Sequence, residues 1–341
     1  MTMEREKGFT LVELMIALVV ALLLIAGVIQ IFISTKQAYR LMDASSRIQE
    51  SARMAMELLG RDIRMAGFQG CTATTRTLVN ALNSTTSYAY AFGIPIEGYE
   101  AISDTSWSPT LPSGIDSAIG GSDVLVVRAA FDEGTPIIGQ PSNTGDCTNA
   151  SSHTANLKVT SSSGFGDGDI VVATNCINAS IFQITNVNES SNTIVHNTGG
   201  AFTPGNATKD LGACYAGNGT LRKLSTRVFY VRNNASEVPS LYRKEGTAAA
   251  LELVEAIENL QVTYGVDTDG DSYANQYLRA SDVTDWSSVV SVRVEILARS
   301  LEDHVTSAPQ PYTFNGSSHS VSDRRLRRAY MMVVSLRNRQ P

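Results

Sequence analysis

Several signatures of common enzyme classes are missing from this chain of 341 residues. It contains no H-E-x-x-H motif and no G-x-S-x-G motif, and its four histidines are scattered. A glycine-rich stretch at residues 164–169 lacks the final glycine of a dinucleotide-binding fingerprint, and no strand-like run precedes it. These absences argue against a metalloprotease, a serine hydrolase and a dinucleotide-dependent enzyme. We therefore expect no enzymatic activity and no organic cofactor.

Cysteine and positive charge are also scarce. Four cysteines are too few for a scaffold held by disulfides alone, and no C-x-x-C pair suggests a zinc ribbon or a thioredoxin-like redox centre. Lysine and arginine total 27 against 33 acidic residues, which gives a net charge of −6. Because binding to phosphates needs positive charge, we expect no nucleic-acid partner.

The apolar residues that are present are unevenly distributed. Mean hydropathy over the whole chain is near zero, which by itself would argue against a membrane protein. Residues 9–33, however, contain 21 apolar residues out of 25, and Leu14 to Ile29 carries no charge. About 20 apolar residues suffice for a helix to cross a bilayer. The chain therefore reads as one membrane-spanning segment followed by a large soluble body.

The N-terminus does not fit a cleaved secretory signal peptide. Residues 1–8 have balanced charge, the apolar run is too long, and no A-x-A site follows it. A plain signal anchor fits the length better but leaves Glu13 unexplained. A carboxylate this far into an apolar helix is costly unless it is paired.

The segment KGFTLVEL at residues 7–14 resembles the class III signal of type IV prepilins and type II secretion pseudopilins. The resemblance implies that a membrane prepilin peptidase cuts between Gly8 and Phe9 and N-methylates Phe9. Glu13 then falls on the glutamate of this family, which acts in subunit assembly. Pairing the new α-amino group with a neighbour's carboxylate would cost much less than burying either charge alone.

The following residues continue the helix. Apolar residues recur at steps of three, four or seven, and no proline occurs before Pro95. These positions are Ala38, Leu41, Ile48, Ala52, Ala55, Leu59, Ile63 and Ala66. A helix from Phe9 to about Met65 would be roughly 85 Å long, with Gly67 as its stop signal. The predicted divisions are a leader at 1–8, a membrane or filament-core helix at 9–33, an amphipathic helix at 34–66 and a periplasmic β-rich head at 67–341.

Further segments resemble the PilW-type minor pilins. RDIRMAGFQGC at residues 61–71 is similar to the end of their long helix, and islands at 168–185, 255–271 and 327–339 also resemble that family. The resemblance implies a low-abundance subunit that helps to initiate the pilus tip, in twitching motility and adhesion. Implied partners are prepilin peptidase, other minor pilins, the major pilin and a tip adhesin. The implied location is the inner membrane of a Gram-negative bacterium, with one membrane span, and then the fibre.

Two alternatives remain open at this level. A minor pseudopilin of a type II secretion system would share the N-terminal signal but serve export. A periplasmic enzyme or sensor could carry a similar anchor, but it would have no need of Glu13.

The head is expected to be an α+β, pilin-like body, with the long helix packed on a mainly antiparallel sheet. Short apolar runs bounded by turn residues predict strands. They lie at 123–127, 170–174, 227–232, 262–266, 289–297 and 330–336. Leu251, Val254 and Ile257 have helical spacing, which predicts a helix over 248–260.

All four cysteines lie in the expected periplasmic head. An even number in an oxidising compartment suggests two disulfides among Cys71, Cys147, Cys176 and Cys214. Three pairings are possible. Sequence order favours Cys71–Cys147 with Cys176–Cys214.

An acidic loop raises the question of calcium. Asp267, Asp269 and Asp271 take positions 1, 3 and 5 of a calcium-loop template, and Asn275 takes position 9. Position 6 lacks glycine, and Leu278 replaces the bidentate glutamate at position 12. The alternative is a polar hairpin turn, so the sequence leaves a calcium site as one of two hypotheses.

The last residues carry the only dense basic run, Arg324, Arg325, Arg327 and Arg328. Residues 323–341 have a net charge of +5, whereas residues 67–322 have −12. The run fits either a solvated strand entry or ion pairs with an acidic neighbouring subunit.

Overall fold

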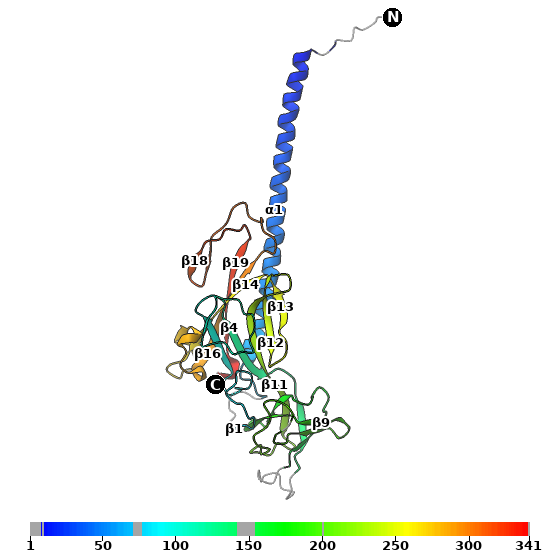
Figure 1. Cartoon of the computed structure of the whole chain (residues 1–341), viewed down its shortest axis with the longest axis vertical. Helices are drawn as coiled ribbons and strands as arrows, with labels where there is room; N and C mark the ends of the chain where they lie inside the picture. The colour runs from blue at the N-terminus through cyan, green and yellow to red at the C-terminus, as the bar shows by residue number, and fades with distance from the viewer. Residues whose placement is uncertain (1–7, 9, 71–76, 142–153, 200, 340–341) are drawn as a thin grey trace.

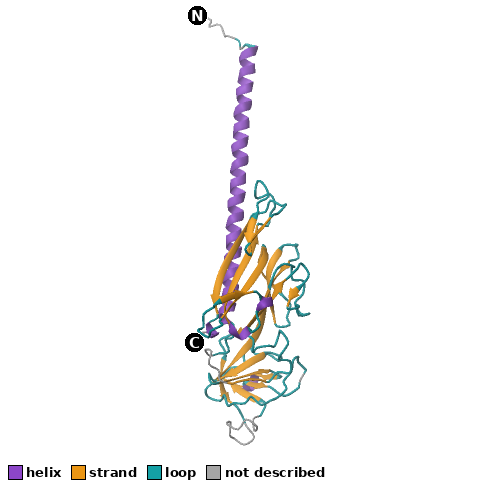
Figure 2. Cartoon of the chain, turned by 90° about the vertical axis from the view of Figure 1, so that its left-hand side faces the viewer, coloured by secondary structure: helices purple, strands orange, loops and turns teal. Residues whose placement is uncertain are grey.

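A single long helix projects from a β-rich head (Figures 1 and 2). The computed structural model describes residues 8, 10–70, 77–141, 154–199 and 201–339. Helix α1 spans Leu11–Met65, and the strands that follow are mostly antiparallel. The predicted α+β fold, with one N-terminal helix on an antiparallel sheet, is therefore confirmed.

The head contains strands and short 3₁₀ helices in the following order. The strands that precede residue 200 are β1 (Thr77–Asn80), β2 (Ile96–Ala101), β3 (Trp107–Ser108), β4 (Val124–Ala130), β5 (Thr135–Gly139), β6 (Asn156–Val159), β7 (Ile170–Thr174), β8 (Asn178–Gln183), β9 (Asn186–Asn188) and β10 (Thr193–Val195). Those after it are β11 (Gly219–Asn233), β12 (Pro239–Glu245), β13 (Leu251–Glu255), β14 (Ile257–Val266), β15 (Gln276–Leu278), β16 (Val289–Arg299), β17 (Tyr312–Phe314), β18 (Ser317–His319) and β19 (Arg327–Ser335). The 3₁₀ helices are η2 (Glu189–Ser191), η3 (Ala280–Asp282), η4 (Trp286–Ser288) and η5 (Arg337–Arg339).

The two halves of α1 have different surroundings. Every side chain from Leu11 to Ile33 is exposed, because no described segment of the head reaches this part of the helix. The second half buries a narrow stripe of small and branched side chains against the head. Its members are Ala44, Ile48, Ala52, Ala55, Leu59 and Ile63.

The predicted apolar face of the helix is thus correct from Ile48 onward and wrong at its upper end. Ala38 and Leu41 are exposed, and Leu41 retains 41% of its surface. Near these residues the head contacts the helix through a hydrogen bond, in which Gln37 donates through Nε2 to the Val305 carbonyl at 2.6 Å. Continuous packing begins about two turns later, at Ala44.

The C-terminal end of α1 is fixed by polar contacts. The helix ends at Met65, and Gly67 adopts φ +77°, a left-handed conformation that glycine accepts without strain. The Gly67 amide donates to the Arg128 carbonyl at 2.9 Å. Asn338 in η5 donates through Nδ2 to the Ala66 carbonyl at 3.2 Å. The expected stop at Gly67 is therefore confirmed, and the C-terminal segment helps to close the helix end.

Strand β11 joins the two lobes of the head. Its first residues, 219–223, pair with β5 and β7, and its later residues pair with β4 and β12. The first group belongs to a lobe with its own apolar core, built around Phe182, Leu221 and Tyr215. Figure 1 shows this lobe, with β1 and β9, at the end of the molecule opposite the N-terminus.

A separate antiparallel sheet, in the order β15-β14-β16-β19, packs with α1. The largest apolar core combines the helix stripe with inward side chains of this sheet and of β4, β11 and β12. All six runs predicted as strands lie in strands, with β7 reproducing the expected range 170–174.

The helix predicted over 248–260 is wrong. Residues 251–255 form β13, which pairs with β12, and residues 257–266 form β14, which pairs with β16. Ala256 between them has φ +65° and redirects the chain from one sheet to the other. The three-residue spacing of Leu251, Val254 and Ile257 therefore reflects a change of sheet, and strand pairing overrides the local pattern.

A buried ion pair ties α1 to β11. Arg227 donates through Nη1 to both carboxylate oxygens of Asp62 at 3.0 and 2.9 Å, and its guanidinium lies 3.5 Å from the centre of the Phe131 ring. Asp62 is 3% exposed. The other acidic partner of Arg227, Glu245, lies farther away at 3.8 Å and is more exposed, so removal of Asp62 would leave the guanidinium without its buried partner.

We predict that Asp62→Ala lowers the free energy of unfolding by about 3 to 5 kcal/mol, because Arg227 loses its buried partner. The measurement is denaturant unfolding of the full chain in detergent. Arg61→Ala is the matched control, since Arg61 is exposed on the same helix turn, and it should change stability by less than about 0.5 kcal/mol. Equal effects of the two substitutions would contradict the prediction.

Asp123 is a second buried polar tie. Its two carboxylate oxygens accept hydrogen bonds from the Ala101 and Val262 amides, each at 2.9 Å, and so connect β2, the start of β4 and β14. Burial raises the pKa of Asp123 to about 7, and the nearby carboxylate of Glu100 adds to the rise. A raised pKa means that the folded chain holds this proton more tightly than the unfolded chain.

This group's contribution to stability is complete below the unfolded pKa near 3.8 and is lost as the pH rises through about 7. We predict that, between about pH 5 and pH 8, ionisation of Asp123 removes on the order of 3 kcal/mol. Asp123→Asn should be less stable at the lower pH, because one amide loses its acceptor, but should show a flatter dependence on pH. Thermal unfolding at both pH values tests this, and an unchanged slope in the variant would contradict it.

Candidate functional site

The candidate site begins at the N-terminal end of α1. Thr10 is the N-cap residue, and its hydroxyl accepts the Glu13 amide at 3.3 Å. The Glu13 carboxylate accepts the Thr10 amide at 2.9 Å and the Thr10 hydroxyl at 3.0 Å. Gly8 is described and exposed, whereas Phe9 lies outside the described residues.

These bonds form a capping box, which satisfies amide groups that the first helical turn leaves unpaired. The T-x-x-E spacing of residues 10–13 carries this signal, and sequence reasoning overlooked it because it considered only the charge of Glu13. The capping box directs the Glu13 carboxylate back toward the amide and hydroxyl of Thr10. A carboxylate in this position is also stabilised by the positive end of the helix dipole.

The next part of the site is the exposed apolar half of α1. The described residues contain one helix that is long and apolar enough to cross a membrane, and none of its most apolar stretch is buried in the head. Leu11 to Ile33 forms a rod about 34 Å long with apolar side chains on every face. Such a surface needs lipid or other helices around it.

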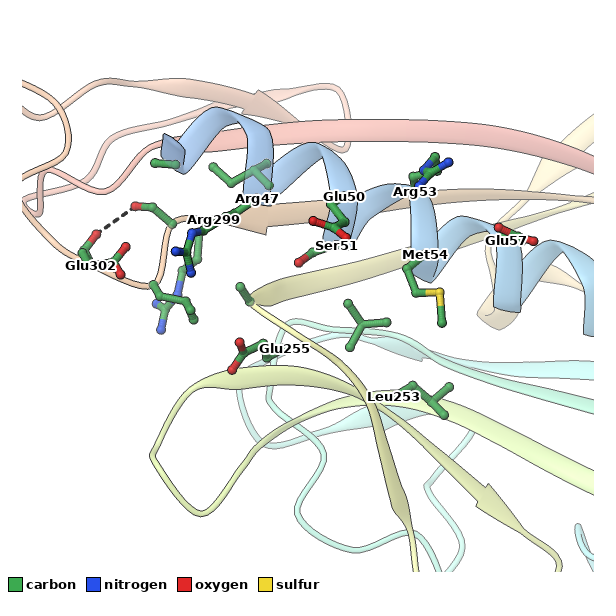
Figure 3. Close-up of a pocket in the computed structure, with 16 residues that line it drawn as sticks. Arg47, Glu50, Ser51, Arg53, Met54, Glu57, Leu253, Glu255, Arg299 and Glu302 are labelled. Atoms are coloured by element: carbon green, nitrogen blue, oxygen red, sulfur yellow. Dashed lines mark hydrogen bonds between the residues drawn. The ribbon is translucent and has the colours of Figure 1, made fainter. Parts of the chain in front are cut away.

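A groove runs between the lower half of α1 and the edge of β13 (Figure 3). Its volume is about 490 Å³, and charged residues of both signs line it together with Met54 and Leu253. The charged lining residues are Arg47, Glu50, Arg53, Glu57, Glu255, Arg299 and Glu302. No histidine lines the groove, so its lining lacks the base of a histidine-dependent hydrolase.

The cysteines are only partly described. Cys176 and Cys214 are both disulfide-bonded. Cys71 and Cys147 lie outside the described residues. The expectation of disulfides in the head therefore holds for the two described cysteines, and the pairing stays a prediction.

The acidic loop brings three carboxylates together. Asp267, Asp269 and Asp271 each place a carboxylate oxygen within 4.8 Å of the others. The Asp267 carboxylate accepts hydrogen bonds from the backbone amides of Gly270 at 2.7 Å, Ser272 at 2.8 Å and Asp269 at 3.1 Å. These hydrogen bonds lower the pKa of Asp267. The loop conformation is thus accounted for by hydrogen bonds alone.

The fourth candidate ligand is arranged differently. The Asn275 side-chain oxygen accepts the Thr268 amide at 2.7 Å, and its nitrogen donates to Asp269 at 3.1 Å. Leu278 at the last template position lies in β15 opposite Tyr264. The three aspartates fit part of a calcium shell, but a calcium ion here stays a prediction.

Calcium titration of the full chain separates the two interpretations. A bound ion stabilises the folded state by mass action, so a calcium site predicts a melting temperature that rises with calcium and not with equal magnesium. Asp269→Asn should abolish that rise while leaving the Asp267 hydrogen bonds in place. A melting temperature that is unchanged in millimolar calcium would leave only the hydrogen-bonded turn.

The basic run is divided between internal and exposed residues. Arg327 pairs with Glu258 and Asp323, each at 2.6 Å, and its guanidinium lowers the pKa of Asp323 to about 2. Arg325 donates to the Ser300 carbonyl at 3.0 Å. Arg328 is exposed. The run is therefore partly structural, which corrects the expectation of a solvated strand entry for Arg327.

Comparisons with known proteins agree with this arrangement. The family model of type IV pilus-assembly protein W matches residues 228–338, and that of the prokaryotic N-terminal methylation motif matches residues 3–29. A curated pilin-like protein, PilA3 of Thermus thermophilus, is 36% identical over 62 residues. These make up 18% of this chain, and the match spans only 27% of that relative. No solved structure matches the chain.

Proposed function

We propose that the chain is a PilW-like minor pilin of the type IV pilus that helps to initiate the tip of the fibre, as the matches to the pilus-assembly and N-terminal methylation families support. In this proposal, prepilin peptidase cuts between Gly8 and Phe9 and methylates Phe9. Before assembly, the protein resides in the inner membrane of a Gram-negative cell with its head in the periplasm. Its partners are other minor pilins, the major pilin and a tip adhesin.

The observation that carries the proposal is the contrast within α1. Its first half is apolar on all sides and touches nothing in the head, whereas its second half is embedded in the head. A plain membrane anchor needs neither this rigid continuity nor a carboxylate in its first turn. A subunit that moves from lipid into a bundle of similar helices needs both, because the same apolar surface serves in each environment.

Cleavage can be measured directly. We predict that mass spectrometry of the mature chain finds Phe9 at the N-terminus with one added methyl group. Gly8→Val should leave the leader attached, because the bulky side chain occupies the position next to the bond to be cut. An intact Met1 in the membrane fraction of the unaltered protein would overturn the processing step.

Glu13 is tested separately from cleavage. We predict that Glu13→Ala leaves the methylated Phe9 and membrane insertion intact but lowers incorporation into fibres by roughly tenfold or more, because an unpaired terminal charge is costly in an apolar bundle. Glu50→Ala is the matched control, since Glu50 is exposed on the same helix beside the head. Normal fibre incorporation of the Glu13 variant would favour a simple membrane anchor over a pilin.

A further inference from the structure

The last strand of the head has a free edge. β19 pairs with β16 over nine residues, from Arg327 to Ser335, and it is the terminal strand of its sheet. It runs beside α1 (Figure 1). Within the part of the chain that the structure describes, no other strand pairs with its outer side.

The direction of the free backbone groups follows from the ladder. The Leu336 amide donates to the Val290 carbonyl at 2.9 Å, which continues the β16–β19 pairing by one residue. In an antiparallel pair, alternate residues point their amide and carbonyl groups to opposite sides. Tyr330, Met332 and Val334 therefore bond to β16, whereas Ala329, Met331 and Val333 turn their backbone groups to the open edge.

The side chains of Ala329, Met331 and Val333 are also exposed. Met331 retains 65% of its surface and Val333 53%. An added strand would gain both backbone hydrogen bonds and apolar contacts here.

The edge strands β13, β9 and β15 are better protected against pairing with a further strand. β13 carries Glu252 and Glu255, and its pairing with β12 has a register shift. β9 and β15 have only three residues each. Charges, irregular register and short length are common ways to prevent unwanted pairing. The centre of β19, AYMMVV at residues 329–334, has no charge, proline or glycine.

Charge at the two ends of the strand selects the partner. Arg328 and Arg337 are exposed, and no acidic residue occurs from 324 to 341. A second copy paired in antiparallel fashion about Met331 would place Arg337 of one chain opposite Arg325 of the other. Like charges in opposed positions are destabilising, so a different partner with acidic flanks fits better.

We propose that the free edge of β19 accepts an extended segment of a different pilus subunit, which adds a fifth strand to the sheet. That segment is apolar at its centre and acidic at its ends. The identity of the partner as a pilus subunit rests on the proposed function. The contact lies beside α1, so it extends the helix-to-helix packing of a fibre into the heads.

Photo-crosslinking in cells that assemble pili identifies the partner. With p-benzoylphenylalanine in place of Met331, we expect one crosslinked pilus subunit, joined through an extended segment that carries acidic residues. Ile138 is the matched control position, because it is 62% exposed on β5, away from this edge. Crosslinks to a second copy, crosslinks equal to those at Ile138, or none at all would overturn the proposal.

Backbone variants test the edge itself. Val333→Pro removes an amide that points outward, so the fold should survive with a melting temperature within about 2 °C, whereas Val334→Pro removes a ladder bond and should destabilise the head. Val333→Pro and Val333→Lys should each lower incorporation into fibres by roughly tenfold or more. Ile138→Lys should not.

These outcomes are distinct from those that test the proposed function. Normal fibres with both folded Val333 variants would overturn the edge contact and leave the pilin assignment standing. Normal fibres with Glu13→Ala would instead count against the pilin assignment. If Val333→Pro fails to fold, Val333→Lys alone decides, because Val333 is already exposed.

Discussion

The structure depends on one helix that must satisfy two environments. Its first half offers apolar side chains in all directions, and its second half offers only a stripe from Ala44 to Ile63. Alanine at several stripe positions lets the sheets approach the helix closely, so the head packs tightly against the helix backbone. The helix is continuous from Leu11 to Met65, so the exposed half and the half embedded in the head form one rod.

Polar contacts between the helix and the head are concentrated at the C-terminal end of the helix. The Asp62–Arg227 pair, the Gly67–Arg128 hydrogen bond and the Asn338 contact with Ala66 all lie within about one and a half turns. They come from β11, β4 and η5, three segments that are far apart in the sequence. The first half of the helix is thus exposed along its whole length, while the second half is fixed in the head.

Much of this arrangement was predictable from the sequence, because its signals are local. The apolar run, the stripe after Ile48 and the strand at 170–174 all follow from periodicity and turn residues. The helix predicted at 248–260 failed because the left-handed Ala256 and two different partner strands decide the conformation there. The exposure of Met331 could not be predicted either, since it depends on which strand ends the sheet. Phe9 and Cys71, where the sequence is most specific, lie outside the described residues.

The region matched by the pilus-assembly family, residues 228–338, starts within β11 and ends in η5. It contains the four-stranded sheet and most of the strands that pack with α1, so it forms the support for the helix. The lobe built on β5 to β10 and the start of β11 lies outside this match, at the end farthest from the N-terminus (Figure 1). It has an apolar core of its own, and it is joined to the support by β11 and by a second apolar cluster that packs Val172 and Ile181 against Ala130 of β4. The part of the head that lies farthest from the N-terminus is therefore built largely from strands outside the family match.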